Sequence, residues 1–426
     1  MGLSDHRPRI EIHSREAIVL PRLVQGGAHT LAAYRAAGGY RALVNALAAP
    51  PEAVLAAIDD SGLRGRGGAG FPVGRKWRAA ARQSAVPKYL VANADEGDAG
   101  AYIDRFLLED DPHALIEGML LAAHAIGASH GWIYLRQEYP AAQASLERAL
   151  TEARGAGLLG PRILGSEQRF EIEVFVGHGS YVCGEESALQ HSIEGRRPEA
   201  MARPPYPTEH GLFAQPTVTN NVETLVNVPW IVAHGAGAYR ALGFSQSRGT
   251  KVVSLNSLFA RPGLYEVEFG VPARHIIEDL GGGLATGKLK GVLIGGPLTG
   301  IIPPHLLDTP FCFEELAAIG AGIGHGGVVA FDEQTSIAAL VEHVFSFGAY
   351  ESCGKCTPCR LGSRRIVEIF SRINAGQHSP KPGAGEWREI VNALRMTSLC
   401  GHGTGLGIFA ESVLRYYGEE LAACFG

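Results

Sequence analysis

Short apolar runs and longer amphipathic stretches alternate along the first half of the chain. The runs at 88–95 (KYLVANAD) and 131–136 (GWIYLR) predict buried strands, and the alternating segment 170–182 begins as another. The stretches 115–128 and 141–156 have helical spacing, and the second carries its charges on one face. Strands that alternate with helices are typical of an α/β core.

The same pattern divides the chain into three predicted domains. Residues 1–243 form the α/β domain, whose N-terminal extension is helical around 30–60. After a plausible linker at 244–250, short strands and one helix predict a small α+β domain over 244–335. The pattern over 336–426 is helical, which predicts a C-terminal helical domain.

Composition and charge exclude several classes of protein. Hydrophobic residues make up 46% of the 426 residues and charged residues 19%, which is typical of a globular chain. The net charge of −5 gives no electrostatic reason to bind nucleic acid. The longest apolar stretch, 116–135, is interrupted by His124 and His130, so we expect no membrane insertion. Seven cysteines are too sparse for a secreted disulfide framework, and a reducing cytoplasm is the expected compartment.

The cysteines supply the most specific motif. Cys353, Cys356 and Cys359 are spaced C-x2-C-x2-C, and Cys400 follows in SLCGHG. Thiolates at this spacing wrap one corner of a cubane, and a remote fourth completes the ligands of a [4Fe–4S] cluster. Structural zinc more often uses two separated C-x2-C pairs, and free thiols are a third alternative. Ordinary thiols are predicted for the remaining cysteines, Cys183, Cys312 and Cys424.

A glycine-rich segment supplies a second candidate site. Residues Gly65–Gly70 match G-x-G-x-x-G, but the preceding segment 54–62 reads as a helix, whereas a dinucleotide-binding unit requires a strand there. One interpretation is a flexible connector. The other is a backbone cradle for a phosphate or a flat cofactor, with positive charge from Arg66 and Lys76 and an aromatic face from Phe71.

Three further polar segments follow predicted strands or a proline-rich stretch. Each is compatible with a solvated turn, and each offers acceptors or amides for the hydroxyls, phosphate or ring of a cofactor. Their joint occurrence with a cluster motif favours a cofactor site. Their polar residues are Asn93, Asp95, Glu96 and Asp98, then Tyr181, Gly184, Glu185 and Glu186, then Asn220, Asn221, Glu223 and Thr224.

From residue 60 onward these motifs resemble a known family, the NADH-oxidising flavoprotein subunit of respiratory complex I. The same module occurs as the diaphorase subunit of soluble NAD-linked formate dehydrogenases and hydrogenases. The matching segments, in the family's order, are GRGGAGFPVGRKW, NADEGDAGAYIDR, SYVCGEESAL, SIEGRRP, RPPYPTEHGLFAQPTVTNNVETLVNVP, ESCGKCTPCRLGS and SLCG. The resemblance implies a Rossmann-like FMN-binding core, a ubiquitin-like (β-grasp) domain and a helical [4Fe–4S] domain. It also implies hydride transfer between NAD(H) and FMN, which needs no protein nucleophile.

The resemblance also implies roles for individual residues. Those expected to bind FMN are Gly65, Arg66, Gly67, Lys76, Asn93, Asp95, Asp98, Tyr181, Gly184, Glu185, Asn220, Asn221 and Thr224. Those expected to contact NAD(H) are Phe71, Glu96, Glu186, Arg203 and Tyr206, with Glu96 near the nicotinamide. The cluster ligands are Cys353, Cys356, Cys359 and Cys400. The sequence departs from the family at Ala79, where an aromatic ring often stacks on the adenine.

The segments GKLKGVLIGGPLTG and IGHGGVVAFDE look most like the formate dehydrogenase branch. That branch implies a larger iron–sulfur or molybdenum/tungsten catalytic subunit as a partner. No cysteine precedes the glycine-rich loop, so a thioredoxin-like [2Fe–2S] domain is expected on a separate small subunit. The alternatives are the complex I subunit, an NAD-linked hydrogenase subunit and a non-catalytic iron–sulfur relay.

Overall fold

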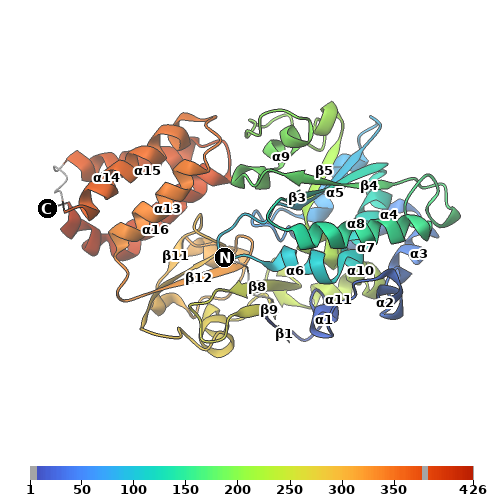
Figure 1. Ribbon diagram of the computed structural model, residues 1–426, viewed down its shortest axis with the longest axis horizontal. Coiled ribbons are helices and arrows are strands. Elements are labelled where there is room, and N and C mark those ends of the chain that lie inside the picture. The colour runs from blue at the N-terminus through green and yellow to red at the C-terminus, as the bar shows by residue number, and fades with distance from the viewer. Residues whose placement is uncertain (1–6, 377–381, 426) are drawn as a thin grey trace.

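The computed structural model describes residues 7–376 and 382–425, which fold into three regions (Figure 1). In the first, four parallel strands lie in the order β4-β3-β2-β5. These strands are β2 (Tyr89–Ala94), β3 (His130–Arg136), β4 (Glu171–Gly177) and β5 (Thr217–Asn221). The helices of this region are α1 (Pro21–Val24), α2 (Leu31–Ala36), α3 (Arg41–Leu47), α4 (Pro51–Ser61), α5 (Val73–Ala81), α6 (Ile103–Asp110), α7 (Pro112–Ile126), α8 (Pro140–Gly155), α9 (Glu186–Ile193), α10 (Val222–His234) and α11 (Ala236–Arg240), with 3₁₀ turns η1 (Ile163–Gly165), η2 (Tyr181–Gly184) and η3 (Leu212–Ala214).

Helix α7 is the centre of the first core, and nearly all of its residues are buried. It begins with Pro112 and ends at Gly127, whose φ of 75° lets the chain leave the helix. Gly118 lies against α10, where a Cβ atom would stand 2.2 Å from the Leu225 carbonyl oxygen. The two helices therefore pack closely only because this position has no side chain.

The second region is built on a mixed six-stranded sheet in the order β1-β9-β8-β12-β10-β11. Its strands are β1 (Arg9–His13), β8 (Thr250–Leu255), β9 (Gly263–Glu268), β10 (Leu289–Ile294), β11 (Ile301–Ile302) and β12 (Gly327–Asp332). The helical segments are η4 (His275–Leu280), η5 (Pro304–Leu306) and α12 (Phe313–Ala318), and the short hairpin β6 (Gly243–Phe244) and β7 (Ser247–Arg248) precedes the region.

The third region is helical, at the left of Figure 1. Its elements are α13 (Ile337–Tyr350), η6 (Pro358–Gly362), α14 (Ser363–Asn374), α15 (Pro382–Thr397) and α16 (Gly401–Cys424). Aromatic rings fill its core, with Trp387 packed edge-on against Phe345 and Phe370 at centroid distances of 5.8 and 5.0 Å. Among the described residues, no helix combines the length and apolar character needed to cross a bilayer.

The predicted fold class is confirmed: an α/β core with a parallel sheet, a small α+β region and a helical C-terminal region. The boundaries at 243 and 335 stay predictions. The structure differs from them in one respect, because β1 pairs in parallel with β9 and so belongs to the second sheet. In the sequence, Arg9–His13 is a short polar segment that gives no strand signal. Its partner strand, β9, lies about 250 residues further along the chain.

Candidate functional site

The expected cofactor residues gather at the carboxyl edge of the parallel sheet. Asn93 and Asp95 lie at the end of β2, and Asn220 and Asn221 lie at the end of β5 beside it. The turn η2 comes shortly after β4, and the Asn93 amide donates a 2.9 Å hydrogen bond to the Gly184 carbonyl. Ligands of parallel sheets bind at this edge, where the loops of several strands converge.

The glycine-rich loop closes this edge from the side of α5. Its backbone is pinned at Arg66, whose N–H donates to Thr224 Oγ1 at 2.8 Å. Gly67 faces the start of α10, where a Cβ atom would stand 3.0 Å from Asn221 Cβ. The loop thus runs beside the N-terminus of α10, where backbone N–H groups favour an anion. This arrangement fits a phosphate-bearing cofactor.

The Arg66 side chain, predicted to supply positive charge to the cradle, is engaged by protein groups. It is 1% exposed, and its guanidinium donates to the Arg248 and Thr250 carbonyls at 2.7 and 3.1 Å and to the Tyr239 hydroxyl at 2.7 Å. The spacing of the loop could not reveal this, because the partners lie about 180 residues away. Arg66 therefore fastens the loop to the second region.

Four charged side chains form a network at the mouth of the site. Lys76 Nζ lies 2.9 Å from Glu186, and the Arg203 guanidinium lies 2.7 Å from Glu185 and 3.0 Å from Glu186. Burial raises the pKa of Glu186, but Lys76 and Arg203 outweigh it and hold that pKa below its ordinary value. Glu186 is therefore an ionised acceptor suited to ribose hydroxyls.

The two aromatic side chains predicted to contact NAD(H), Phe71 and Tyr206, are both exposed to solvent. Phe71 is 47% exposed and Tyr206 53% exposed, which is unusual for large apolar rings. The Arg75 guanidinium lies 5.7 Å from the Phe71 ring centroid. An exposed ring with a guanidinium beside it suits a flat, anionic ligand.

Glu96, predicted near the nicotinamide, lies in the loop after β2 and is held by protein groups. It is 2% exposed and accepts the backbone N–H groups of Ile103, Asp104 and Arg105 at the start of α6. Burial alone would raise the pKa of Glu96, but the His325 imidazole at 3.0 Å and these backbone bonds hold it below its ordinary value. Glu96 is thus a buried helix cap, and Asp98, two residues later, shares its loop.

Asp95 carries an unsatisfied acceptor within this edge. It is 8% exposed, and its Oδ2 has no hydrogen-bond partner among the described residues. Burial raises the pKa of Asp95 to about 7. A buried carboxylate oxygen without a hydrogen-bond donor lowers the stability of the folded state. The hydroxyls of a ribityl chain can supply such donors. The residues present therefore fit FMN.

Replacing Asp95 by asparagine should stabilise the flavin-free protein above pH 7. The folded pKa of about 7 exceeds the ordinary value of 3.8, so folding loses stability as pH rises from 3.8 to 7. We expect Asp95→Asn to raise the free energy of unfolding by on the order of 4 kcal/mol at pH 8 and to leave it unchanged below about pH 4, measured by urea unfolding. Asp308→Asn is the control of opposite sign, because Arg274 lowers the pKa of Asp308. A gain that does not grow with pH would contradict the assignment.

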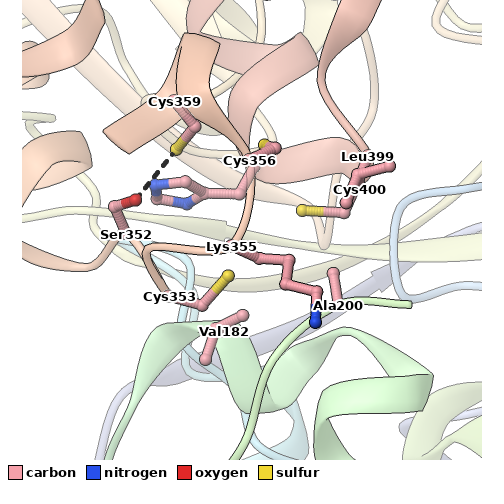
Figure 2. Close-up of a pocket in the computed structure, with 10 residues that line it drawn as sticks. Val182, Ala200, Ser352, Cys353, Lys355, Cys356, Cys359, Leu399 and Cys400 are labelled. Atoms are coloured by element: carbon pink, nitrogen blue, oxygen red, sulfur yellow. Dashed lines mark hydrogen bonds between the residues drawn. The ribbon is translucent and has the colours of Figure 1, made fainter. Parts of the chain in front are cut away.

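The predicted cluster ligands line one cavity (Figure 2). Cys353 and Cys356 come from the loop before η6, Cys359 lies in η6, and Cys400 immediately precedes α16. All four are free thiols. The walls are completed by Val182, Ala200, Ser352, Lys355, Leu399 and His402.

The spacing of the sulfur atoms favours a cluster over zinc. A zinc ion with Zn–S bonds of about 2.3 Å holds its thiolates about 3.8 Å apart. No three of the four sulfur atoms lie within 4.8 Å of one another, although all four line the same cavity. Cys359 Sγ and the Ser352 hydroxyl form a 3.2 Å hydrogen bond, the kind of contact that tunes a cluster thiolate. The donor set therefore fits [4Fe–4S].

The cluster cavity and the flavin edge share a wall. Val182 of η2 and Ala200 line the cavity, and the Tyr181 and His402 ring centroids lie 5.4 Å apart. Arg197 donates to the Cys353 carbonyl at 2.8 Å, and Lys355 pairs with Glu199 at 2.6 Å. The third region is thus fastened to the loops that carry the flavin candidates.

Sequence reasoning missed Trp77, and it did not predict the protein partners of two predicted residues, Glu185 and Asp98. The buried Trp77 donates from Nε1 to Asn220 Oδ1 at 2.8 Å, which orients the amide at the end of β5. Glu185 caps α9 by accepting the N–H groups of Ser187 and Ala188, so part of its carboxylate is already engaged. Asp98 accepts the Tyr181 hydroxyl at 2.7 Å. Trp77 lies inside the GRKW motif, but no spacing rule pairs it with Asn220.

Two protein-family models match different parts of the chain. Residues 58–230 match the Nuo51 FMN-binding domain, and residues 339–424 match the NADH-ubiquinone oxidoreductase-F iron-sulfur binding region. A subunit of the NADH-quinone oxidoreductase of Rhizobium meliloti (strain 1021) is 40% identical over 96% of this chain and 97% of its own length. The NADP-reducing hydrogenase subunit HndC of Solidesulfovibrio fructosivorans is 43% identical over 87% of this chain and 75% of its own length.

A solved structure agrees with these relatives. The crystal structure of an NAD⁺-reducing [NiFe]-hydrogenase in the H₂-reduced state superposes with a TM-score of 0.83 at 36% identity. The match covers 97% of this chain and 67% of that chain. Together with the cysteine-lined cavity and the flavin-compatible edge, these similarities show that the chain belongs to the family of NADH-oxidising flavoprotein subunits that carry FMN and a [4Fe–4S] cluster.

Proposed function

We propose that the chain is the diaphorase subunit of a multi-subunit, NAD-linked oxidoreductase of the complex I or hydrogenase type. When bound, FMN would supply the chemistry that accepts one hydride, and with it two electrons, from NADH and passes these electrons on singly. The residues of the chain bind and orient the nucleotide and the flavin, and the cysteines hold the acceptor cluster. The observation that carries the proposal is that η2, which holds the flavin candidates Tyr181 and Gly184, also contributes Val182 to the lining of the cluster cavity.

The parent complex is the finer part of the proposal. The sequence predicted a formate dehydrogenase, whereas the relatives described above are complex I and hydrogenase subunits. These relatives support the alternative prediction better. Subunits of this kind act with iron–sulfur partners, so we propose a soluble assembly in the cytoplasm with a [2Fe–2S] subunit and a larger catalytic subunit. Copurification of the tagged chain, with mass spectrometry of its partners, tests which complex it is.

The direct test is made on the purified chain. We expect a flavin absorption spectrum, NADH-dependent reduction of ferricyanide, and release of FMN on acid treatment. Recovery of FAD would contradict the single phosphate cradle, and absence of flavin and of NADH oxidation would favour a non-catalytic iron–sulfur relay.

Replacing Ala79 by phenylalanine should tighten NADH binding several-fold. Ala79 lies on α5 one turn beyond Lys76 and is half-buried, so the site lacks a ring there. A stacking partner contributes on the order of 1 kcal/mol. Because adenine stacking is present in both the ground and transition states, KM should fall while kcat stays unchanged.

The measurement is a Michaelis curve for NADH with ferricyanide as acceptor. Ala141→Phe adds the same ring to the exposed start of α8 and serves as the matched control. An unchanged or higher KM in Ala79→Phe would show that the adenine does not lie over this position.

A further inference from the structure

A buried histidine from the second region reaches the flavin edge. His325 lies between α12 and β12, in a turn that packs against the loop after β2. Its Nε2 atom lies 3.0 Å from Glu96 Oε1 and 3.2 Å from Asp104 Oδ2. The side chains of His325, Glu96 and Asp104 are 8%, 0% and 1% exposed, respectively, so this histidine–carboxylate triad is closed to solvent.

The triad requires a cation at its centre. Burial alone would lower the pKa of His325, but the two carboxylates outweigh burial and raise it well above its ordinary value. The imidazole is therefore an imidazolium at neutral pH. The titratable and charged groups around it are Glu96, Asp104, Asp98, Glu223, Lys251 and Tyr139.

A metal ion fits this triad less well than a proton does. Glu96 Oε1 already accepts two backbone N–H groups, and its Oε2 accepts the Arg105 N–H and the Tyr139 hydroxyl. Asp104 Oδ2 accepts the Asn221 amide at 2.6 Å. The carboxylate oxygens that face His325 Nε2 are thus already hydrogen-bonded, whereas Asp104 Oδ1 and His325 Nε2 have no hydrogen-bond partner among the described residues.

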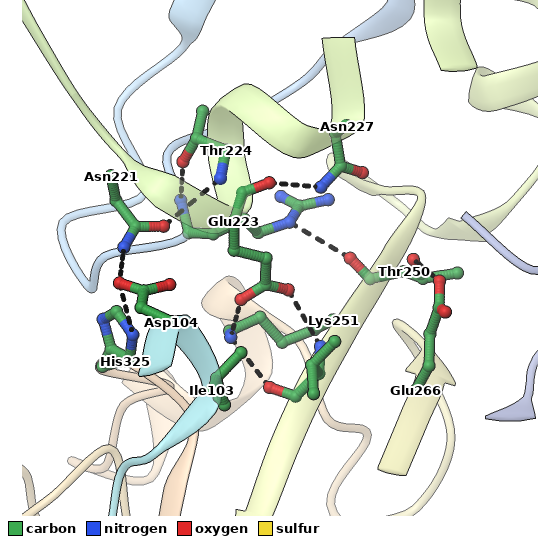
Figure 3. Close-up of polar contacts among 12 residues, drawn as sticks. Ile103, Asp104, Asn221, Glu223, Thr224, Asn227, Thr250, Lys251, Glu266 and His325 are labelled. Carbon is green, nitrogen blue, oxygen red and sulfur yellow. Dashed lines mark hydrogen bonds and ion pairs between the residues drawn. The ribbon is translucent and has the colours of Figure 1, made fainter. Parts of the chain in front are cut away.

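His325 touches the flavin candidates along two paths. Along the first, Asp104 Oδ2 accepts Asn221 Nδ2, and Asn221 Oδ1 in turn caps α10 at the Thr224 N–H (Figure 3). Along the second, the His325 backbone N–H donates to Asp98 Oδ2 at 3.1 Å, while Asp98 Oδ1 accepts the Tyr181 hydroxyl. The first path thus ends at the N-terminus of α10, and the second ends at η2.

We propose that His325 is a positioning residue of the flavin site, an imidazolium from the second region that fixes Asn221 through Asp104 and holds Asp98 through its own backbone. The inference rests on the proposed function, because Asn221 and Asp98 are flavin candidates. Burial raises the pKa of Asp104 to about 6 even with the imidazolium beside it. Without that charge, Asp104 takes up a proton near neutral pH, and the Asn221 amide loses its charged acceptor.

The test measures flavin release from the holoprotein. Dilution frees FMN, whose fluorescence rises, and the dissociation constant follows at each pH between about 6 and 9. We expect His325→Gln to weaken FMN binding by about tenfold and to make it pH-dependent. Asp104→Asn combined with His325→Gln should return the constant to within about threefold of the parent value, because a neutral amide accepts from Asn221 without a counter-charge.

Two further readouts separate positioning from general damage. His275→Gln is the matched control, because His275 forms a histidine–carboxylate pair with Asp279, 2.8 Å apart, on the exposed segment η4. It should leave FMN binding unchanged. In ¹⁵N-histidine NMR spectra, the ring signal lost in His325→Gln should be that of a charged imidazole at pH 8.

The outcomes are distinguishable. FMN binding by the parent with an unchanged constant in His325→Gln would overturn the inference and leave the proposed function standing. A double variant as weak as His325→Gln, or a neutral ring at pH 8, would also overturn it. A parent protein that binds no FMN would remove the proposed function itself. A stoichiometric metal ion that is lost in His325→Gln, while the cluster iron is retained, would overturn the inference. It would show that the triad binds a metal ion and holds no imidazolium.

Discussion

Replacing Cys356 by alanine should cost the protein its cluster while the flavin stays bound. Cys356 lines the cysteine cavity together with Cys353, Cys359 and Cys400, and a cubane cluster requires a thiolate for each of four irons. The flavin candidates lie on other elements, at the carboxyl edge of the parallel sheet. We therefore expect iron to fall from about four atoms per chain to nearly none, as judged by iron and sulfide analysis.

NADH-dependent ferricyanide reduction should persist in Cys356→Ala, because ferricyanide can take electrons at the flavin, whereas reduction of the cluster by NADH should disappear. Cys424→Ser is the control, since Cys424 lies near the end of α16 and its thiol donates to the Glu420 carbonyl away from the cavity. Unchanged iron content in Cys356→Ala, or zinc in the parent protein, would contradict the cluster assignment.

The second large effect is expected on stability, from a buried ion pair that joins the first two regions. Lys251 on β8 pairs with Glu223 at the start of α10, and both side chains are 0% exposed (Figure 3). Glu223 also accepts the Val252 N–H at 2.9 Å. Lys251→Met would leave Glu223 as an uncompensated buried charge, so the free energy of unfolding should fall by about 3–5 kcal/mol.

The measurement is urea unfolding at pH 7. Adding Glu223→Gln to Lys251→Met should recover most of the loss, because the stranded charge is removed. Arg274→Ala is the surface control, where breaking the exposed pairs with Glu278 and Asp308 should lower the free energy of unfolding far less. A loss in Lys251→Met no larger than that of the control would show that the pair is not closed to solvent.

Sequence reasoning succeeded where function depends on local spacing. The C-x2-C-x2-C motif predicted the cysteines that line the cavity, and the strand ends at Asn93 and Asn221 meet at one edge because parallel strands share their direction. Periodicity also predicted α8 to within one residue, since its buried face repeats with the helical period.

The sequence could not predict contacts in which a side chain finds its partner far along the chain. Arg66 and Glu96 both belong to motifs that resemble flavin- and nucleotide-binding segments, and both are buried on internal partners. Arg66 bonds to the segment before β8, and Glu96 faces His325, more than 200 positions away. No periodic pattern encodes such pairs, because they depend on how the second region packs against the first.

The pairing of β1 with β9 has a consequence for the order in which the chain can fold during synthesis. Arg15, just after β1, is separated from its partner Glu268 by 253 positions. At about 5–20 residues per second, the ribosome needs roughly 13–50 s to deliver that partner. The parallel sheet therefore completes its translation, and can begin to fold, while β1 is still a free end. The segment after β1 can be fixed only after Glu266 has been synthesised. The buried Glu266 carboxylate then accepts the N–H groups of Ile18, Val19 and Leu20.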